Sequence, residues 1–549
     1  MTKRLLAIIV LSLLIVAFLA ASVYAAKSKP NVWKYRIYKD KRTVLKMAGA
    51  EGVPFGADAT NAPASLGFDE KASLSPGITI GTSTYDIQSN VRMNRQVEWR
   101  DNQMVHFIWT KSITDYAATR VTGYEVWEPD DAQLVFVGTG GGCDVHGDGA
   151  RSGYVSLDID TENKANIGNH YDPTGTGEAY MTTVFYDNLS ASCFYGPYAR
   201  SIPDSVAKMA FSESEITPGD WRLTWPQHEY QVLDGDTITH LITHQSYADA
   251  AAHIGDPAKM IYFRRVGSDT VGYWEYPPMI VDTITNISNS VAASRTSGKV
   301  DIVWSAPPGA YPGDPESNAR NGNLDDGLGS VQRTCDIFYM ESNNMGAPGS
   351  WGNKVNVTKY DSSVGGWLTT GDISPLIDPS DVLHVIWNAR EAQPDPNGTA
   401  LGVWTLYFGS RIFHWDEASD EVRVVTDRNW DITREEFNDS TCTGGAWNQM
   451  SCVKPMLSYC DGKFYVVFVQ FLDLFHGVHD DCALLRWQGG GWSGAANGEL
   501  YLSVSDNNGR NWDLPRNLTT SYTPMCDTAA AALECDADHW PAIPRFGME

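Results

Sequence analysis

Five polar side chains occupy the same place in a short apolar segment that recurs along the chain. The copies of this segment span residues 105–109, 239–243, 300–304, 383–387 and 464–468. Three places before the last residue of each copy stand, in the same order, His106, His240, Asp301, His384 and Tyr465. The chain has only 12 histidines, so three at equivalent positions indicate a shared role. Residues at one register of a strand share a face of the sheet, where these groups could bind a metal, a water molecule or a ligand.

A second group of residues offers carboxylate ligands. Asp144 and Asp148 lie in a glycine-rich stretch, and they are calcium candidates because hard cations are held by several oxygens on a loop. Further carboxylates follow at Asp158, Asp160 and Glu162. The spacing lacks the closing glutamate of an EF-hand, so an ordinary solvated turn is the preferred interpretation.

A third polar group contains His476, His479, Asp480 and Asp481. These residues could ligate a metal or form the rim of a binding site, although an ordinary polar loop is again preferred. A zinc site is not expected, because the sequence contains no C-x-x-C pair.

The recurring segment shows which elements must position these side chains. Each copy is a short apolar strand with an alternating polar position, and residues 181–187 form a sixth, looser copy. The copies recur at intervals of 58 to 83 residues, and an aromatic strand-like unit follows most of them. A four-stranded antiparallel sheet fits in such an interval, and no long stretch keeps a convincing helical period.

About six such sheets cannot each bury both faces alone, and radial packing around an axis solves this problem. The sequence therefore predicts an all-β fold, a six- or seven-bladed β-propeller of four-stranded antiparallel sheets. If the recurring segments are the innermost strands, the five polar residues encircle the axis as a ligand-binding ring. The preferred alternative is that each histidine donates a hydrogen bond to a neighbouring sheet, because a wide ring spreads its members too far apart for one metal.

The sharpest local motif lies near the C-terminus and reads S-x-N-x-G-x-x-W, at Ser505, Asn507, Gly509 and Trp512. Side-chain oxygens at the first two positions can close a tight turn, the glycine permits a positive φ, and the tryptophan can plug the space between sheets. A degraded copy contains Ser342, Gly346 and Trp351. This part of the chain resembles the Asp-box, or BNR repeat, of sialidase-like propellers, with asparagine where the family usually has aspartate. In that family the motif is a structural device, so the resemblance implies a structural role for these residues.

The resemblance also implies what a catalytic site would contain. Sialidases bind the substrate carboxylate with three arginines, and they use a Tyr–Glu pair and an aspartate in catalysis. The nearest match to the segment that carries the first arginine is at Arg200, with an inserted serine and in the second repeat. The other members cannot be placed by spacing. The catalytic residues are therefore unknown, and whether the chain is an enzyme stays open, with a non-enzymatic role preferred.

The N-terminus has the pattern of an export signal. Two basic residues precede an apolar run over residues 5–21, and Val23 and Ala25 are suited to cleavage after Ala25. A retained membrane anchor is the alternative, since the run just reaches the minimum length for a span. We expect a signal peptide over residues 1–25, an irregular arm or linker over 26–90, and the propeller over 91–549.

Charge and cysteine content limit the partners and the compartment. The net charge of -26 argues against nucleic acid and anionic lipid, which bind basic surfaces. Nine cysteines in an exported chain can form disulfides. The pairs suggested by proximity are Cys442–Cys452, Cys526–Cys535 and Cys460–Cys482, with Cys143–Cys193 as a weaker suggestion and Cys335 left over.

Long insertions over 310–333, 388–402 and 429–450 carry aromatic and amide residues that suit sugars. The segment 539–547 resembles the approach to a first strand, so it either completes a blade or marks a truncated sequence, which is slightly favoured.

Together these features predict a secreted or cell-surface module, with the periplasm as an option, that binds a glycan or surface polymer or acts as a scaffold. It requires no cofactor, with calcium as an option. The alternatives are an exo-acting, sialidase-like glycoside hydrolase and a purely structural surface component.

Overall fold

The computed structural model divides the chain into two units, Met1–Ala64 and Ser65–Glu549, and all described residues belong to the second. The predicted signal peptide lies outside the described residues, as does most of the predicted arm. The described residues are 78–83, 88–89, 93–100, 104–112, 120–136, 142–146, 151–172, 181–193, 202–217, 219, 221–246, 258–267, 272–284, 288–306, 335–359, 366–394, 403–426, 442–443, 452–471, 482–486, 492–496, 498–519 and 540–547.

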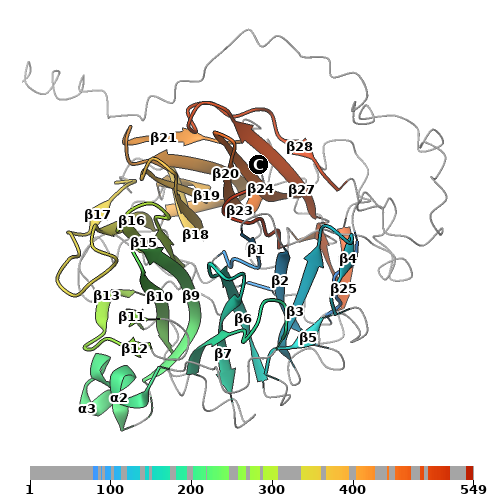
Figure 1. Ribbon diagram of the computed structural model, residues 1–549. Coiled ribbons are helices and arrows are strands. Elements are labelled where there is room, and N and C mark those ends of the chain that lie inside the picture. Colours follow the sequence, from blue (N-terminus) through green and yellow to red (C-terminus); the bar gives the residue numbers. More distant parts are fainter. Residues whose placement is uncertain are drawn as a thin grey trace, which may run out of the picture. The chain divides into compact units, whose positions relative to one another are not determined.

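Six antiparallel sheets follow one another along the second unit and form a six-bladed β-propeller (Figure 1). The first strands of consecutive blades contact one another, so these strands surround the axis. The predicted fold class is confirmed, and the blade number is the lower of the two that were predicted.

The first three blades occupy residues 97–284. Blade 1 contains β1 (Val97–Trp99), β2 (Val105–Lys111), β3 (Val121–Glu128), β4 (Gln133–Leu134) and β5 (Cys143–Asp144). Blade 2 contains β6 (Arg151–Ile159), β7 (Ala165–Asp172) and β8 (Met181–Tyr186). Blade 3 contains β9 (Arg222–Leu233), β10 (Asp236–Ser246), β11 (Ala258–Val266), β12 (Tyr273–Trp274) and β13 (Met279–Ile284).

The other three blades complete the ring. Blade 4 contains β14 (Asn289–Ala293), β15 (Val300–Ala306), β16 (Asp336–Ser342) and β17 (Val355–Asn356). Blade 5 contains β18 (Gly366–Ile377), β19 (Leu383–Pro394), β20 (Val403–Asp416) and β21 (Glu421–Val424). Blade 6 contains β23 (Cys452–Cys460), β24 (Lys463–Phe471), β27 (Gly498–Ser505) and β28 (Arg516–Asn517). A small separate sheet contains β22 (Cys442–Thr443), β25 (Cys482–Arg486) and β26 (Trp492–Ala496).

The place of the recurring segments within the blades differs from the prediction. They lie in β2, β10, β15, β19 and β24, which are second strands, so the assumption that they are innermost is wrong. The sixth copy forms β8, the third strand of blade 2, and the expected loop 388–402 is strand up to Pro394. A second strand that is covered on both faces by neighbouring blades is as apolar as an innermost one, which explains the error.

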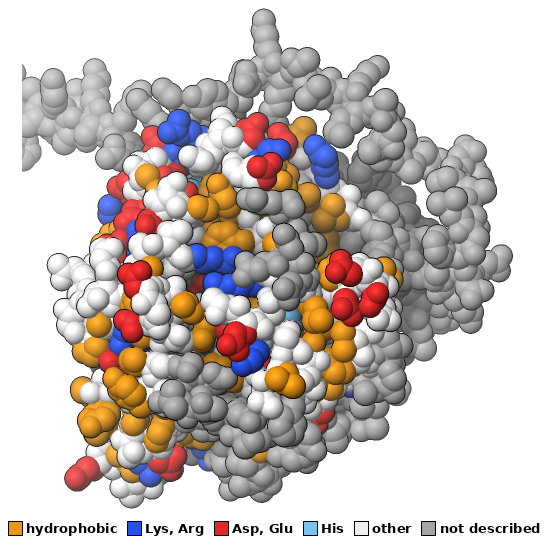
Figure 2. Space-filling view, in the orientation of Figure 1, with side chains coloured by type: hydrophobic (Ala, Val, Ile, Leu, Met, Phe, Trp, Pro, Cys, Tyr) orange, Lys and Arg blue, Asp and Glu red, His pale blue; other side chains and the backbone are white. Residues whose placement is uncertain are grey.

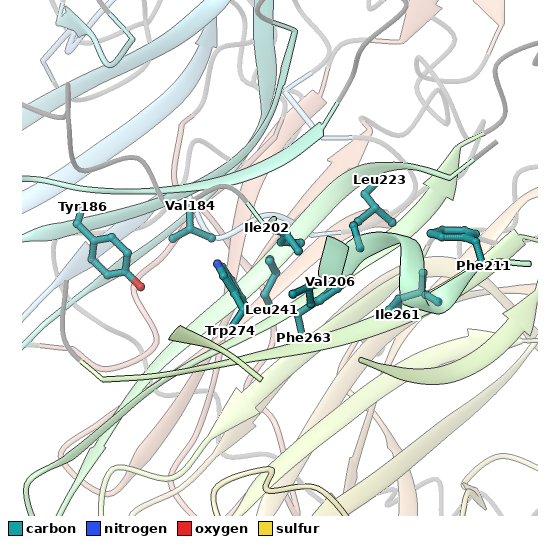
Figure 3. Packing of buried hydrophobic residues seen from close by; sticks show 12 residues of the cluster. Val184, Tyr186, Ile202, Val206, Phe211, Leu223, Leu241, Ile261, Phe263 and Trp274 are labelled. Carbon is teal, nitrogen blue, oxygen red and sulfur yellow. The ribbon is translucent and has the colours of Figure 1, made fainter. Parts of the chain in front are cut away.

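Hydrophobic clusters fill the seams between consecutive blades. One cluster lies at each of the seams 1–2, 2–3, 3–4, 4–5 and 5–6. Figure 3 shows seam 2–3, where Val184 of β8 and Phe263 of β11 belong to one cluster with Val206 of a short helical segment. Fully burying a large apolar side chain contributes roughly 1.5–3 kcal/mol, so these seams hold the blades together.

The helical segment at seam 2–3 is an addition to the all-β fold. It contains α2 (Asp204–Ala207), η4 (Lys208–Ala210) and α3 (Glu213–Ile216), and the sequence analysis did not predict it. A capping box at Ser212 and Glu215 begins α3. The segment covers the outer part of the cluster, where blade 2 has only three strands among the described residues.

The two ends of the axis differ in their connections. We call the end where the innermost strands begin the loop face, and the end where they finish the turn face. Because each blade is an antiparallel meander, the connections 307–335 and 395–402 and the link 427–451, which includes β22, leave from the loop face. The turn face carries short turns such as 234–235 and 461–462. Within the described part of the chain, no helix is long and apolar enough to cross a membrane.

Among the described residues the structure has one disulfide, which joins Cys143 of β5 to Cys193, beyond the end of β8. The weakest of the four suggested pairs is therefore confirmed. Each of the other suggested pairs includes a cysteine whose side chain lies outside the described residues.

Candidate functional site

The five residues of the proposed ring lie one strand further from the axis than that hypothesis requires. They are His106 on β2, His240 on β10, Asp301 on β15, His384 on β19 and Tyr465 on β24. The first four are buried and Tyr465 is half-buried. In blade 2 the equivalent position holds Asn166 of β7. The structure therefore does not bring these side chains together around the axis.

Each of the three histidines has a side-chain partner on the third strand of its own blade. His106 Nδ1 lies 2.6 Å from the Tyr124 hydroxyl, and His240 Nδ1 lies 2.8 Å from the Tyr262 hydroxyl. In blade 5 the partner is another histidine, with His384 Nδ1 3.0 Å from Nε2 of His414. The preferred alternative expected bonds to a neighbouring sheet, and for these three contacts that detail is wrong.

Burial sets the charge of these histidines. It lowers the pKa of His106 and of His240 to about 3, so both are neutral near pH 7. His240 Nε2 also lies 3.1 Å from Gln231 Oε1 on the innermost strand. Buried, neutral and hydrogen-bonded, these groups are suited to holding strands together rather than to binding a ligand.

The motif at Ser505 forms a tight turn between the third and fourth strands of blade 6. The Ser505 hydroxyl accepts a hydrogen bond from the Gly509 N–H at 2.9 Å and donates one to Asn507 Oδ1 at 3.0 Å. Asn507 Oδ1 also accepts from the Asn511 N–H at 2.9 Å. Trp512 is buried and meets an aromatic ring of blade 5 edge-on. The resemblance to sialidase-like propellers is thus confirmed for the fold, and this turn joins two blades as the motif predicts.

The degraded copy in blade 4 forms a related turn. The Ser342 hydroxyl accepts from the N–H groups of Asn344 and Gly346, at 3.2 and 3.1 Å. Trp351 meets Tyr262 of blade 3 edge-on, with 5.0 Å between the ring centroids. Blades 3 and 5 therefore each present a histidine-containing pair to the turn of the blade that follows.

Of the two calcium candidates, Asp144 lies in the part of the chain that the structure describes. Asp144 Oδ1 accepts from the His146 N–H at 3.1 Å, and Asp148 lies outside the described residues. Asp160 closes its own turn by accepting from the N–H groups of Glu162 and Lys164. In the part of the chain that the structure describes, no three His, Cys, Asp or Glu residues are arranged to hold a metal ion. The polar group at 476–481 and Arg200 lie outside that part.

At the loop face, the innermost strands carry an irregularity that the sequence analysis missed. In four blades this strand has a non-glycine residue with φ between 50° and 57°, beside a shift in the pairing register: Tyr154, Trp225, Asp372 and Lys454. Such residues are uncommon, and bulges re-aim side chains near functional sites. The repeated bulge makes the loop-face part of the innermost strands our candidate binding site.

Charged groups at these bulges are buried and closely paired. Lys454 Nζ lies 2.5 Å from Asp372 Oδ1, and the Asn388 amide donates to Asp372 Oδ2 at 2.8 Å. The Lys454 ammonium also stands 4.9 Å from the ring centroid of Trp540. A second contact of this kind involves Tyr154, whose ring centroid lies 5.0 Å from the guanidinium of Arg120. Lys454, Asp372 and Asn388 are buried and paired with one another, so the half-buried ring of Tyr154 is a group at these bulges that a polar ligand could contact.

At the turn face, one guanidinium connects three innermost strands. Arg545 Nε lies 2.8 Å from Glu98 of blade 1, Nη2 lies 2.5 Å from Asp158 of blade 2, and Nη1 contacts Glu229 of blade 3. We call these three carboxylates the socket. Burial opposes the charged form of Arg545, but Asp158 and Glu98 raise its pKa. Three carboxylates around one arginine are the inverse of the three arginines around one carboxylate that a sialidase would have.

The sequence contained a signal for the socket. Each carboxylate stands inside an innermost strand between apolar or aromatic neighbours, in V-E-W, L-D-I and H-E-Y. An isolated acid in a buried strand predicts a charged partner. Asp158 was instead grouped with the calcium candidates, because its partner Arg545 is too distant in sequence for a spacing argument.

Comparisons with known proteins return structural matches only. No family model matches the sequence, and neither does any curated protein. A Trypanosoma rangeli sialidase mutant with trans-sialidase activity matches over 74% of this chain and 56% of its own, at 12% identity and a TM-score of 0.34. A Dyadobacter fermentans protein of unknown function matches over 77% and 99%, at 11% identity and a TM-score of 0.36. The polysaccharide lyase Uly1 matches over 81% and 94%, at 11% identity and a TM-score of 0.33.

The chain spans little more than half the length of the sialidase that it matches. At these identities the likeness concerns the fold alone. The activity and ligand of this chain must therefore be argued from its own residues.

Proposed function

We propose that this chain is an exported β-propeller that binds a glycan or another surface polymer at its loop face and serves as a scaffold at the cell exterior. The export signal in the sequence supports this location. The proposal requires no catalytic metal or cofactor, and calcium at Asp144 and Asp148 stays an option.

The state of the axial carboxylates favours binding over hydrolysis. A glycosidase needs two carboxyl groups that face the scissile bond, one to donate a proton and one to act as base or nucleophile. At the loop-face bulges the carboxylate of Asp372 is buried and paired with Lys454. At the turn face Glu98, Asp158 and Glu229 are at most 8% exposed, and all three contact Arg545. Because their charge is neutralised within the protein, they are poorly suited to proton transfer with a substrate. This observation carries the proposal.

The composition of the loop face favours a polymer as the ligand. The segments that leave from it include Tyr311, Trp430 and Trp447 among many Asn, Asp and Gly residues. Aromatic faces stack on sugar rings, and amides bind sugar hydroxyls. At the bulges themselves, Tyr154 and Trp225 are half-buried, so part of each side chain is accessible.

Two assays on the full chain test the proposal. Glycan and polysaccharide arrays should show binding, whereas a panel of aryl glycosides and a fluorogenic sialoside should show no turnover. Trp225→Ala should weaken binding about tenfold, the scale of one lost stacking contact. Leu514→Ala, which removes an exposed apolar side chain ahead of β28 at the turn face, is the matched control and should bind normally.

Other outcomes decide against the proposal. Turnover that a single carboxylate substitution abolishes would establish the glycoside hydrolase instead. Blank arrays together with self-association of the chain would indicate the purely structural component.

A further inference from the structure

The seam between the last and the first blade is built differently from the other five. The hydrophobic clusters of the described residues join consecutive blades only. Blade 6 and blade 1 share no strand, because each is made from its own stretch of sequence. The described segment 540–547 lies at this seam, where the red end of the chain runs beside β1 and β23 (Figure 1).

The backbone of this segment is attached to both blades. On the blade 6 side, the Tyr459 N–H donates to the Arg545 carbonyl and the Gly547 N–H donates to the Tyr459 carbonyl, both at 2.8 Å. These two bonds form a parallel bridge to β23. On the blade 1 side, Trp99 Nε1 donates to the Phe546 carbonyl at 2.5 Å. The segment therefore follows β23 along the axis towards the turn face.

A second buried guanidinium, that of Arg95, links the start of blade 1 to blades 5 and 6. Arg95, just before β1, donates to the Leu457 carbonyl of blade 6 at 3.0 Å and to the Pro375 carbonyl of blade 5 at 3.1 Å. It also reaches the carbonyl of Ile543 at 3.4 Å. Burial, and next the charge of Arg545, lower the pKa of Arg95 to about 9.

The socket makes the attachment of segment 540–547 depend on the side chain of Arg545. Glu98, Asp158 and Glu229 come from three different blades, and burying three carboxylates without a counter-charge is strongly unfavourable. Arg545, which is 3% exposed, supplies that charge with a planar group whose three nitrogens face three different acids. A lysine ammonium could not reach all three acids in this geometry.

We propose that the socket is a guanidinium-binding site and that the segment 540–547 is its tethered ligand, a clasp that closes the propeller between blade 6 and blade 1. The tether gives the arginine a high effective concentration at the socket. Arg295, in the turn after β14, stacks 4.1 Å from the centroid of the Phe546 ring and covers the clasp from blade 4. Figure 2 shows basic side chains near the centre of the face in view.

Substitution of Arg545 in the full chain tests the clasp. Arg545→Ala leaves three buried acids unpaired and should lower the thermal midpoint by on the order of 10 °C. Hydrogen exchange at the Tyr459 amide should accelerate more than about tenfold, because its acceptor is the Arg545 carbonyl. Arg516→Ala, which removes an exposed arginine of β28, is the matched control and should change neither value.

Chemical rescue distinguishes a guanidinium site from a general loss of stability. Millimolar n-propylguanidinium should raise the midpoint of Arg545→Ala in a saturable way, whereas n-butylammonium at equal ionic strength should not. Neither probe should affect Arg516→Ala. If Arg545→Ala does not fold, Arg545→Lys takes its place, and a midpoint equal to that of the unchanged chain would overturn the proposal. Equal behaviour of Arg545→Ala and Arg516→Ala, or rescue by both probes alike, would also overturn it.

Discussion

Gly509 of blade 6 lies directly against the imidazole of His414 in blade 5. A Cβ atom on Gly509 would overlap Cε1 of that ring, and the φ of Gly509 is 72°. At the turn of blade 4, a Cβ on Gly346 would overlap the Tyr262 hydroxyl in the same way. The turns of blades 4 and 6 thus fit onto the polar pairs of blades 3 and 5, which gives the histidines of the recurring segment a role in joining blades.

Gly509→Ala should destabilise the protein by about 2–4 kcal/mol, because it adds a steric overlap with His414 to the cost of a positive φ. Gly349→Ala is the matched control, since Gly349 has a φ of 77° but no atom within 4 Å of the added Cβ. It should cost only about 1 kcal/mol. Urea unfolding measures both values, and equal losses would show that Gly509 does not make a close contact.

Stability should fall steeply in mild acid. The folded protein keeps His106 and His240 neutral, since burial lowers the pKa of each to about 3, and it lowers that of His228 to about 4. The unfolded chain binds these protons below about pH 6.5, so acid favours the unfolded state. Between about pH 6 and 4 each histidine should remove roughly 1.4 kcal/mol of stability per pH unit.

The variant His106→Gln isolates one of these groups. It should reduce the slope of the free energy of unfolding against pH by the contribution of one proton, which is roughly 1.4 kcal/mol per pH unit. The glutamine keeps a polar group near the Tyr124 hydroxyl. Urea midpoints measured from about pH 7.5 to about pH 4.5 span the range in which the unfolded histidine takes up its proton. An unchanged slope would show that His106 is accessible to protons in the folded protein.

The sequence was sufficient to predict the propeller but not the order of strands within a blade. Periodicity identifies apolar strands. The second strands of the blades, such as the one that contains residues 383–387, are the most apolar and are therefore the easiest to recognise in the sequence. The innermost strands are interrupted by bulges, as at Lys454, and contain buried acids such as Glu98, so they do not fit a regular alternation. Local motifs with a fixed spacing, such as the turn at Ser505, could be predicted in detail.

The socket could not be predicted because its members are brought together only by closure of the ring. Glu98, Asp158 and Glu229 lie on separate blades, and Arg545 comes from the far end of the chain. No local spacing connects them. The bulges at the loop face depend in the same way on tertiary packing, since Asp372 is held by Lys454 of the next blade.

Asp301→Asn should stabilise the protein near pH 7. Burial raises the pKa of Asp301 well above its usual value, so the folded protein retains a proton that the unfolded chain releases above about pH 4. Stability is therefore lost as the pH rises through that range. Lys299 keeps its contact with Glu341 at 2.9 Å, so the asparagine leaves no isolated cation. The expected gain is about 1–3 kcal/mol at pH 7 and less at pH 4.

Asp416→Asn is the control, because its expected effect on stability at pH 7 has the opposite sign. Burial opposes the charged form of Asp416, but hydrogen bonds from Ser419 and Arg423 together lower its pKa, so the charged form stabilises the folded protein. This variant should lose stability at pH 7, and the loss should shrink as the pH falls. Urea unfolding at both pH values compares the two variants, and a destabilised Asp301→Asn would contradict the prediction.

The disulfide between Cys143 and Cys193 should stabilise the fold by about 2–4 kcal/mol, because it closes a long loop in the unfolded chain. It links β5 of blade 1 to the segment after β8 of blade 2, across seam 1–2. The double variant Cys143→Ala and Cys193→Ala should unfold at a lower urea concentration than the unchanged chain.

Reduction provides the control for this prediction. A thiol reductant should lower the urea midpoint of the unchanged chain to that of the double variant and leave the variant itself unaffected. Persistence of the bond requires an oxidising compartment, so isolation of the protein from its native source with this disulfide intact would also support export. If reduction and substitution both leave the midpoint unchanged, the packing of Val155 and Tyr124 at the same seam is sufficient to hold blades 1 and 2 together.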